Sequence, residues 1–130
     1  MPVRYTLEDR LPTIRCEGTY SVEELRTPWL VVAERSDLQL PLACVLDMRA
    51  SDSVLKRSIG ELRVIADTFL QRAHVTGRRI AIVSTGGARF GLMRMASTWV
   101  ELAGVEVKVL RELEEAQRWA LSRLNTPDRS

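Results

Sequence analysis

The feature that most constrains the fold of this chain is an alternation of strand-like and helix-like segments that begins at residue 42. Apolar runs occupy residues 42–48, 78–84 and 105–110, and each is followed by a stretch whose apolar residues recur at steps of three and four. Parallel strands need connections of this length, and such connections are usually helices. The alternation therefore predicts a mainly parallel sheet with right-handed crossovers and helices packed around it.

The first two runs are almost continuously apolar, which is typical of strands covered on both faces. Residues 105–110 alternate instead, as a strand near a sheet edge does. Two more alternating segments, 3–7 and 12–18, are separated by Glu8-Asp9-Arg10 and predict a hairpin. The complete order is ββαβαβαβα, an α/β fold with about five strands and about four helices.

Helix starts are indicated by capping residues. Ser21 with Glu24 three residues later forms a capping box. Thr27 followed by Pro28 predicts a second start, and so a kinked or two-part helix. Ser53 is the predicted N-cap of the next helix. The later helices are expected over residues 54–73, 87–103 and 112–124.

Size and composition favour one globular domain. The chain has 130 residues, of which 45% are apolar, so residues 1–130 form a single domain with a frayed tail at 126–130. Charged residues make up 28% and the net charge is +2, which argues against disorder and against a strongly basic nucleic-acid binder. Of the basic residues all but Lys56 and Lys108 are arginine. A GC-rich genome and selection for guanidinium groups both explain that bias, and the choice is left open.

The chain also lacks the marks of export and membrane insertion. Its N-terminus has no signal-peptide pattern, and no apolar stretch approaches the roughly 18 residues of a membrane span. Cys16 and Cys44 lie in apolar strand-like segments and are expected to be buried free thiols. These features predict a cytoplasmic protein.

A candidate site follows from the two central strands. Ligands of open parallel sheets bind beyond the carboxyl ends of the strands, where backbone amides and helix N-termini favour an anion. If the two strands are neighbours, one rim gathers hydroxyls, free amides and arginines. The candidate residues are Arg49, Ser51, Ser53, Ser84, Thr85, Gly86, Gly87 and Arg89.

Each element of this rim also has a plainer explanation. The segment S-T-G-G-A-R matches neither a P-loop nor a dinucleotide fingerprint, and two glycines are common in a tight strand-to-helix turn. Arg49 has Asp47 and Asp52 nearby as salt-bridge partners. The helix that follows, which includes Phe90, is apolar over a wide arc. It is either a well-covered core helix, or one of its rows binds a partner or lines an apolar pocket, with Arg89 and Arg94 at the edge of that surface. Both alternatives stay open.

The sequence contains no catalytic or metal-binding constellation. His74, the one histidine, lies near a predicted helix C-terminus, where an imidazolium needs no catalytic explanation. No serine or cysteine has a base beside it, and Asp47 has no second carboxylate at a matching spacing. We therefore expect a protein that is not an enzyme, with no metal and no cofactor.

Several motifs stand in a recognisable order along the chain. F-G-x-x-R-M (residues 90–95) is followed by A-G-V-E-V (103–107) and by L-E-E-A-x-x-W (113–119). V-L-D-M-R-A (45–50) and E-G-x-x-S-x-E-E-L (17–25) extend the pattern over nearly the whole chain. In this order and spacing the chain resembles the small bacterial proteins called SpoIIAA-like, or STAS/SEC14-domain, proteins.

The resemblance implies a STAS-like fold: a mixed sheet whose first strand is antiparallel, with helices on both sides. In the anti-sigma-factor antagonists of the wider group, a partner kinase phosphorylates a serine of a D-S-S-G motif after the third strand. That motif is absent from residues 50–60, so the phosphoswitch is not carried over. Ser51, Ser53 and Ser58 remain candidate phosphorylation sites near that position. The SEC14 part of the family name implies a lipid-like ligand.

Two functions are compatible with these observations. The first is a non-catalytic interaction or regulatory module that docks a protein partner through the strand-end loops and the third helix. The alternative is a carrier or sensor that binds a small amphiphilic or anionic ligand, lipid-like or phosphate-bearing, at the same rim. Homodimerisation through an open sheet edge or the third helix is left open, as are the identity of the ligand or partner and its pathway.

Overall fold

The structure is a computed structural model that describes residues 3–8, 10–35, 37, 41–76 and 78–122. Its central feature is a five-stranded sheet in the order β1-β2-β3-β4-β5. Strand β1 pairs antiparallel with β2, and the other three pairings are parallel. The strands are β1 (Val3–Glu8), β2 (Leu11–Glu17), β3 (Cys44–Ala50), β4 (Arg79–Val83) and β5 (Glu106–Leu110). The predicted order, the N-terminal hairpin and the edge position of the last strand are confirmed.

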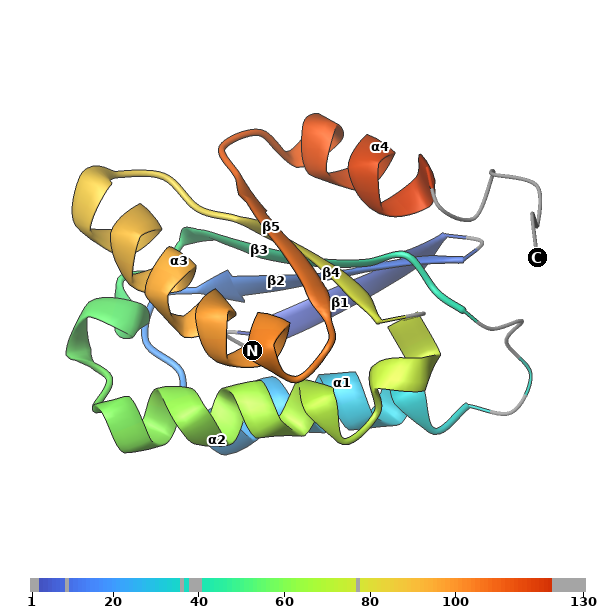
Figure 1. Cartoon of the computed structure of the whole chain (residues 1–130), viewed down its shortest axis with the longest axis horizontal. Coiled ribbons are helices and arrows are strands. Elements are labelled where there is room, and N and C mark those ends of the chain that lie inside the picture. Colours follow the sequence, from blue (N-terminus) through green and yellow to red (C-terminus); the bar gives the residue numbers. More distant parts are fainter. Residues whose placement is uncertain (1–2, 9, 36, 38–40, 77, 123–130) are drawn as a thin grey trace.

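Four α-helices cover the two faces of this sheet. Helices α1 (Val22–Ala33), α2 (Ile59–Leu70) and α3 (Gly87–Leu102) pack on one face, and α4 (Leu113–Ser122) lies alone on the other (Figure 1). Two 3-10 helices, η1 (Ser53–Lys56) and η2 (Ala73–Thr76), flank α2. None of the described helices has the length and apolar character needed to cross a membrane. The predicted frayed tail at 126–130 lies outside the described residues.

The predicted restart of the first helix at Thr27 is wrong. Helix α1 begins at the Ser21 capping box, as expected, and continues through Pro28 to Ala33. A proline in a helix interior removes one hydrogen bond and crowds the preceding turn. Pro28 is buried beside Trp29, which has no solvent-exposed surface. The apolar packing of this turn offsets the lost hydrogen bond, so the helix stays in one piece.

The predicted start of the second helix at Ser53 is also wrong, by five residues. Ser58 is the N-cap of α2: its Oγ accepts from the Glu61 N–H at 3.1 Å, and the Glu61 carboxylate accepts from the Ser58 N–H at 3.2 Å. Ser53 instead lies in η1, where its buried hydroxyl donates to the Gly18 carbonyl oxygen at 3.1 Å. Leu55 and Ile59 are consequently exposed.

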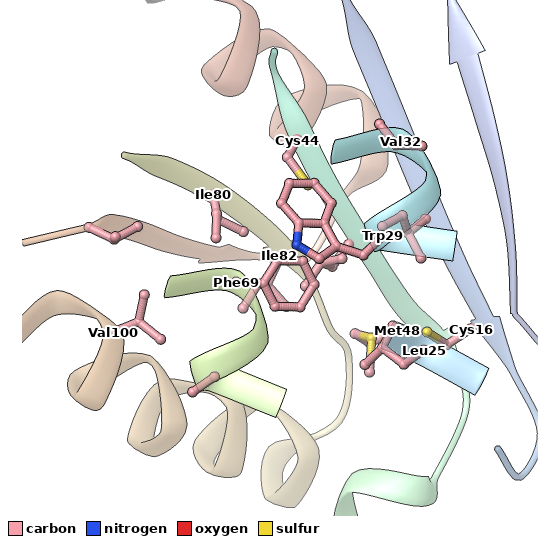
Figure 2. Packing of buried hydrophobic residues seen from close by; sticks show 14 of the residues in the cluster. Cys16, Leu25, Trp29, Val32, Cys44, Met48, Phe69, Ile80, Ile82 and Val100 are labelled. Carbon is pink, nitrogen blue, oxygen red and sulfur yellow. The ribbon is translucent and has the colours of Figure 1, made fainter. Parts of the chain in front are cut away.

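The larger core layer lies between the sheet and helices α1, α2 and α3. Trp29 of α1 and Phe69 of α2 face one another there, with ring centroids 4.9 Å apart (Figure 2). Alternate residues of β3, namely Cys44, Leu46 and Met48, point into this layer. Burial of this set supplies most of the hydrophobic stabilisation, because large apolar side chains contribute roughly 1.5–3 kcal/mol each.

The second core layer, under α4, is built mainly from small residues. Val45 and Val83 of the sheet meet Ala116 and Ala120 of α4, and all four are at most 4% exposed. Small side chains let the helix approach the sheet closely. Arg79 of β4 holds the C-terminal half of α4 to the sheet, because its Nη1 donates to the Trp119 carbonyl oxygen at 2.9 Å.

Candidate ligand-binding cavity and strand-end rim

The two central strands end side by side, as the candidate site requires. Asp47 of β3 is the register partner of Val83 of β4. The segments 49–53 and 84–89 therefore lie close together at one edge of the sheet, where Arg89 of the second segment contacts Arg49 of the first. We call these two segments the strand-end rim. The sequence made this convergence conditional on the two strands being neighbours, and the parallel pairing of β3 with β4 meets that condition.

Arg49 is held by a carboxylate of its own strand. Its Nε and Nη2 each donate to an Asp47 carboxylate oxygen at 2.9 Å, a two-pronged charged hydrogen bond. Burial raises the pKa of the Asp47 carboxyl, but the hydrogen bonds and charge of Arg49 outweigh it and hold that pKa below its usual value. The plainer explanation of Arg49, a salt bridge to Asp47, is therefore present in the structure.

The serines of the rim tie β3 to the loop before α1. Both Ser51 and Ser53 are buried, and their hydroxyls donate to the Gly18 carbonyl oxygen. Ser53 also accepts from the Tyr20 N–H at 3.3 Å. Ser58, by contrast, is exposed and its hydroxyl caps α2. Phosphorylation of these three serines stays a prediction, and at Ser51 or Ser53 it requires the loop to open first.

Arg89 fills the space between the two strand exits. It forms an ion pair with Asp52 at 3.0 Å and directs Nη1 toward the carbonyl oxygens of Arg49 and Ser51, at 3.2 and 3.4 Å. Its side chain also lies against Gly86. Much of the anion pocket expected here is therefore occupied by the protein's own guanidinium groups.

At the N-terminus of α3, polar groups of the strand-end rim lack hydrogen-bond partners among the described residues. Gly86 is its N-cap with φ of +81°, and no side chain among the described residues caps the helix. Ser84 is buried, and its Oγ lacks a hydrogen-bond partner within the described chain. Gly86 and Gly87 are exposed and Thr85 is half-buried.

The two remaining candidates lie further along α3. Phe90 is half-buried, and the guanidinium carbon of Arg111 lies 4.3 Å from the centre of its ring. Arg94 is exposed, as is its neighbour Met95. Within the part of the chain that the structure describes, no three metal-ligating side chains lie together.

A cavity of about 60 Å³ lies elsewhere, between the sheet and the layer of helices α1, α2 and α3. Its wall is almost entirely apolar. Figure 2 shows several of the wall residues, among them Leu25, Met48 and Phe69, in the layer between helices and sheet. The walls come from β3, β4, β5 and all three helices, so this cavity is set into the larger core.

One charged side chain, Arg57, lines the cavity. It precedes α2, and its side chain is only 9% exposed. Nη1 donates to a Glu61 carboxylate oxygen at 3.2 Å, Nη2 donates to the Tyr20 carbonyl oxygen, and the guanidinium carbon lies 4.8 Å above the Tyr20 ring. Its Nε is buried and has no hydrogen-bond partner among the described residues. An unpaired buried donor of a cation is costly, and a bound anion satisfies it.

Two neutral polar groups lie beside this arginine. Burial raises the pKa of the Tyr20 hydroxyl, and burial raises the pKa of the Cys16 thiol to about 12. Both groups therefore stay protonated at neutral pH. Among the described residues, Arg57 forms an ion pair with Glu61, whose side chain is half-exposed at 45%.

Arg57 is not among the candidate residues predicted from the sequence. It lies in K-R-S, inside the helix that was expected over residues 54–73. The signal that could have found it is the second capping box, Ser58 with Glu61, which has the same spacing as Ser21 with Glu24. A helix start at Ser58 turns Arg57 into a loop residue that can point inward.

Comparison with known proteins supports the fold and leaves the function open. No model of a known protein family matches the chain, and no curated protein matches it. A solved structure does: the crystal structure, at 2.25 Å resolution, of an uncharacterized protein of the DUF3478 family with a SpoIIAA-like fold, from Shewanella loihica PV-4. The two are 17% identical, the match covers 91% of each chain, and the TM-score is 0.61. The chain thus has a SpoIIAA-like fold, as its motifs implied.

Proposed function

We propose that this protein is a non-catalytic carrier or sensor for a small amphiphile with an acidic head group. The apolar part of the ligand enters the cavity between the sheet and α1, α2 and α3, and the head group binds at Arg57. The observation that carries the proposal is the buried guanidinium on the wall of an otherwise apolar cavity, with its Nε lacking a partner among the described residues. This site replaces the strand-end rim as the place of ligand binding.

The volume of the cavity restricts how an alkyl chain can bind there. About 60 Å³ is less than the roughly 150 Å³ engineered cavity that accepts benzene, so an alkyl chain has to displace wall side chains. Met48 and Met93 belong to the wall, and the unbranched methionine side chain adapts to new shapes at low cost. Helix α2, which roofs the cavity, packs against α1 and α3 and is flanked by η1 and η2. A small outward shift of α2 lengthens the cavity.

The chemistry of Arg57 selects the head group. Carboxylates and phosphates accept paired hydrogen bonds from a guanidinium, and a neutral hydroxyl does not compensate the buried charge. Charged hydrogen bonds contribute roughly 1.5–3 kcal/mol, so the acid should bind at least about tenfold more tightly than the matching alcohol. Glu61 already neutralises part of the charge, which favours a singly charged head group.

The test uses three probes with the same chain: decanoic acid, decyl phosphate and decanol. Native mass spectrometry of the protein as purified, followed by titration with each probe, measures binding, and thermal unfolding measures stabilisation. A probe at a hundredfold excess over its dissociation constant should add about 2.7 kcal/mol. We expect at least one of the two acidic probes to bind and decanol to bind weakly. Equal binding of acid and alcohol, or no binding of any probe, refutes the proposal.

Two arginine variants locate the head group. Arg57→Gln should lose at least about tenfold in affinity for the acidic probe, while Arg57→Lys should retain part of it because the charge stays. Arg72→Gln is the matched control, since Arg72 pairs with Glu34 on the surface and does not line the cavity. An unchanged affinity in folded Arg57→Gln places the head group elsewhere.

A second candidate function is docking of a protein partner at the strand-end rim and α3. The observation that favours it is the uncapped start of α3 at Gly86, whose amides suit a carboxylate side chain of a partner. Affinity capture from the native cells with wild-type protein and an Arg94→Ala variant tests it, because Arg94 is exposed on α3. Partners that are recovered equally by both, or none at all, count against docking there.

A further inference from the structure

Strand β1 is an edge of the sheet whose outer side has no described neighbour. It pairs with β2 on one side only. Its residues Arg4, Tyr5, Thr6 and Glu8 are all exposed. An edge strand of this kind presents a row of backbone N–H and C=O groups that another strand can pair with. The question is which strand fits.

The register rules of an antiparallel pair restrict the answer. Residues directly opposite each other point their side chains to the same face, and their backbone groups point either both toward the partner strand or both away from it. When β1 pairs with a second β1 around a two-fold axis, only registers that match odd with odd and even with even positions are allowed. Of these registers, only those centred on Tyr5 and on Thr6 pair five residues of β1, because β1 spans Val3–Glu8.

The register centred on Thr6 is complementary in charge and in polarity. It places Arg4 opposite Glu8 of the second copy, and by symmetry Glu8 opposite Arg4. Each Arg4 already pairs with Glu17 of its own chain at 2.7 Å, so it gains a second carboxylate partner on this face. On the other face Tyr5 lies opposite Leu7 at both ends. Opposite charges and apolar pairs directly across a strand pair each contribute roughly 0.2–1 kcal/mol. The register centred on Tyr5 leaves Arg4 opposite Thr6 and gains no ion pair.

We propose that the protein forms a two-fold dimer in which β1 of each copy pairs antiparallel with β1 of the other, centred on Thr6. The two sheets then join into one. The apolar rim of a groove between β1 and α1 supports this arrangement, because it includes Tyr5, 36% exposed, and Val31, 49% exposed. The second copy brings its own Tyr5 and Leu7 to this side of the strand.

The opposite edge of the sheet fits a second copy less well. Charged side chains on both edges already have partners in the same chain: Glu106 of β5 pairs with Arg79, as Arg4 of β1 pairs with Glu17. The two edges differ in the length of strand that can pair. Self-pairing of β5 that places Glu106 opposite Lys108 joins residues 106–108 alone. The β1 register joins residues 4–8. The dimer proposed here is independent of the ligand site, because no cavity-lining residue belongs to β1.

Cysteine cross-linking tests the pairing and its register together. In the proposed dimer the two Thr6 residues face each other with Cα atoms about 4.5–5.5 Å apart, which suits a disulfide. The two Tyr5 residues are two positions apart along the paired strands, so their Cα atoms lie about 8 Å apart. This distance is too long for a disulfide. Thr6→Cys should therefore form a covalent dimer under mild oxidation and Tyr5→Cys should not. Cys16 and Cys44 are fully buried and do not compete.

Charge reversal with rescue tests the ion pairs. Sedimentation velocity over a concentration series should show a wild-type dimer, a shift toward monomer for R4E and for E8R, and recovery of the dimer in the double variant. E101R is the matched control, since Glu101 is exposed on α3 far from β1 in the sequence. Circular dichroism confirms that each variant folds.

The outcomes decide the proposal. A wild-type protein that stays monomeric to high micromolar concentration, cross-linking at position 5 instead of position 6, or no cross-linking at either position overturns it. If R4E and E8R both remain dimers, the interface lies elsewhere. The β5 edge and α3 are then the next surfaces to test.

Discussion

Filling the cavity with Ala96→Val should separate a ligand site from a packing defect. Ala96 of α3 is buried and lines the cavity. At about 24 cal/mol per Å³, an empty volume of about 60 Å³ corresponds to roughly 1.4 kcal/mol of lost stability. Valine adds two carbons, worth about 0.8 kcal/mol each, and costs roughly 0.6 kcal/mol of helix propensity. The free energy of unfolding should rise by about 1 kcal/mol.

The matched control is the same substitution on the other face of the sheet. Ala116 of α4 is fully buried against small side chains and lines no cavity in the described structure. Ala116→Val should overpack that layer and lower stability by about 1–3 kcal/mol. Urea unfolding followed by circular dichroism measures both variants. The Ala96→Val gain corresponds to a rise in melting temperature of about 3–4 °C for a domain of this size.

The same Ala96→Val protein should lose affinity for the acidic decyl probe, because the added carbons occupy the path of the chain. Destabilisation of Ala96→Val by as much as Ala116→Val would show that no usable space exists beside Ala96. A stabilised variant that binds the probe as well as wild type would show that the ligand uses a different route. Either result refutes the reasoning.

Three further predictions concern stability and reactivity. The Arg49 hydrogen bonds lower the pKa of Asp47 in the folded protein. The Asp47 carboxylate therefore stabilises the fold at pH values above its unfolded-state pKa of about 4. This stabilisation is lost as the pH falls below that value. Asp47→Asn should therefore flatten the acid limb of a stability–pH profile and cost roughly 1–3 kcal/mol at pH 7. Ser58→Ala should cost about 1 kcal/mol in urea unfolding because it removes the N-cap of α2. Burial raises the pKa of the Cys16 and Cys44 thiols to about 12, so a thiol reagent at pH 8 should label them only after denaturant is added; rapid labelling of native protein would contradict this.

The sheet could be predicted from the sequence because its strands carry strong, short-range signals. The apolar runs and the alternating hairpin segments locate all five strands to within a residue or two. The convergence of Asp47, Arg49 and Ser84 at one edge follows from parallel pairing alone. Local periodicity and the rules of sheet topology are enough for these features.

The use of the rim side chains could not be predicted, since it depends on rotamers and on distant partners. Arg89 follows two glycines and looks free to bind a ligand, yet it reaches across to Asp52 and to backbone oxygens of the neighbouring segment. Arg57 was hidden for a different reason. A helix predicted to start at Ser53 includes Arg57, whereas α2 begins after Ser58 and leaves Arg57 in the segment before it.

The order of the strands has a consequence for biosynthesis. Each strand from β2 onward lies beside the strand that precedes it in the chain. During translation every new strand therefore finds its neighbour already made, and none has to wait for a segment still inside the ribosome. The exception is α4: until it emerges, the Val45 and Val83 face of the sheet stays open to water. Emergence of α4 is thus the step that covers this apolar face of the sheet.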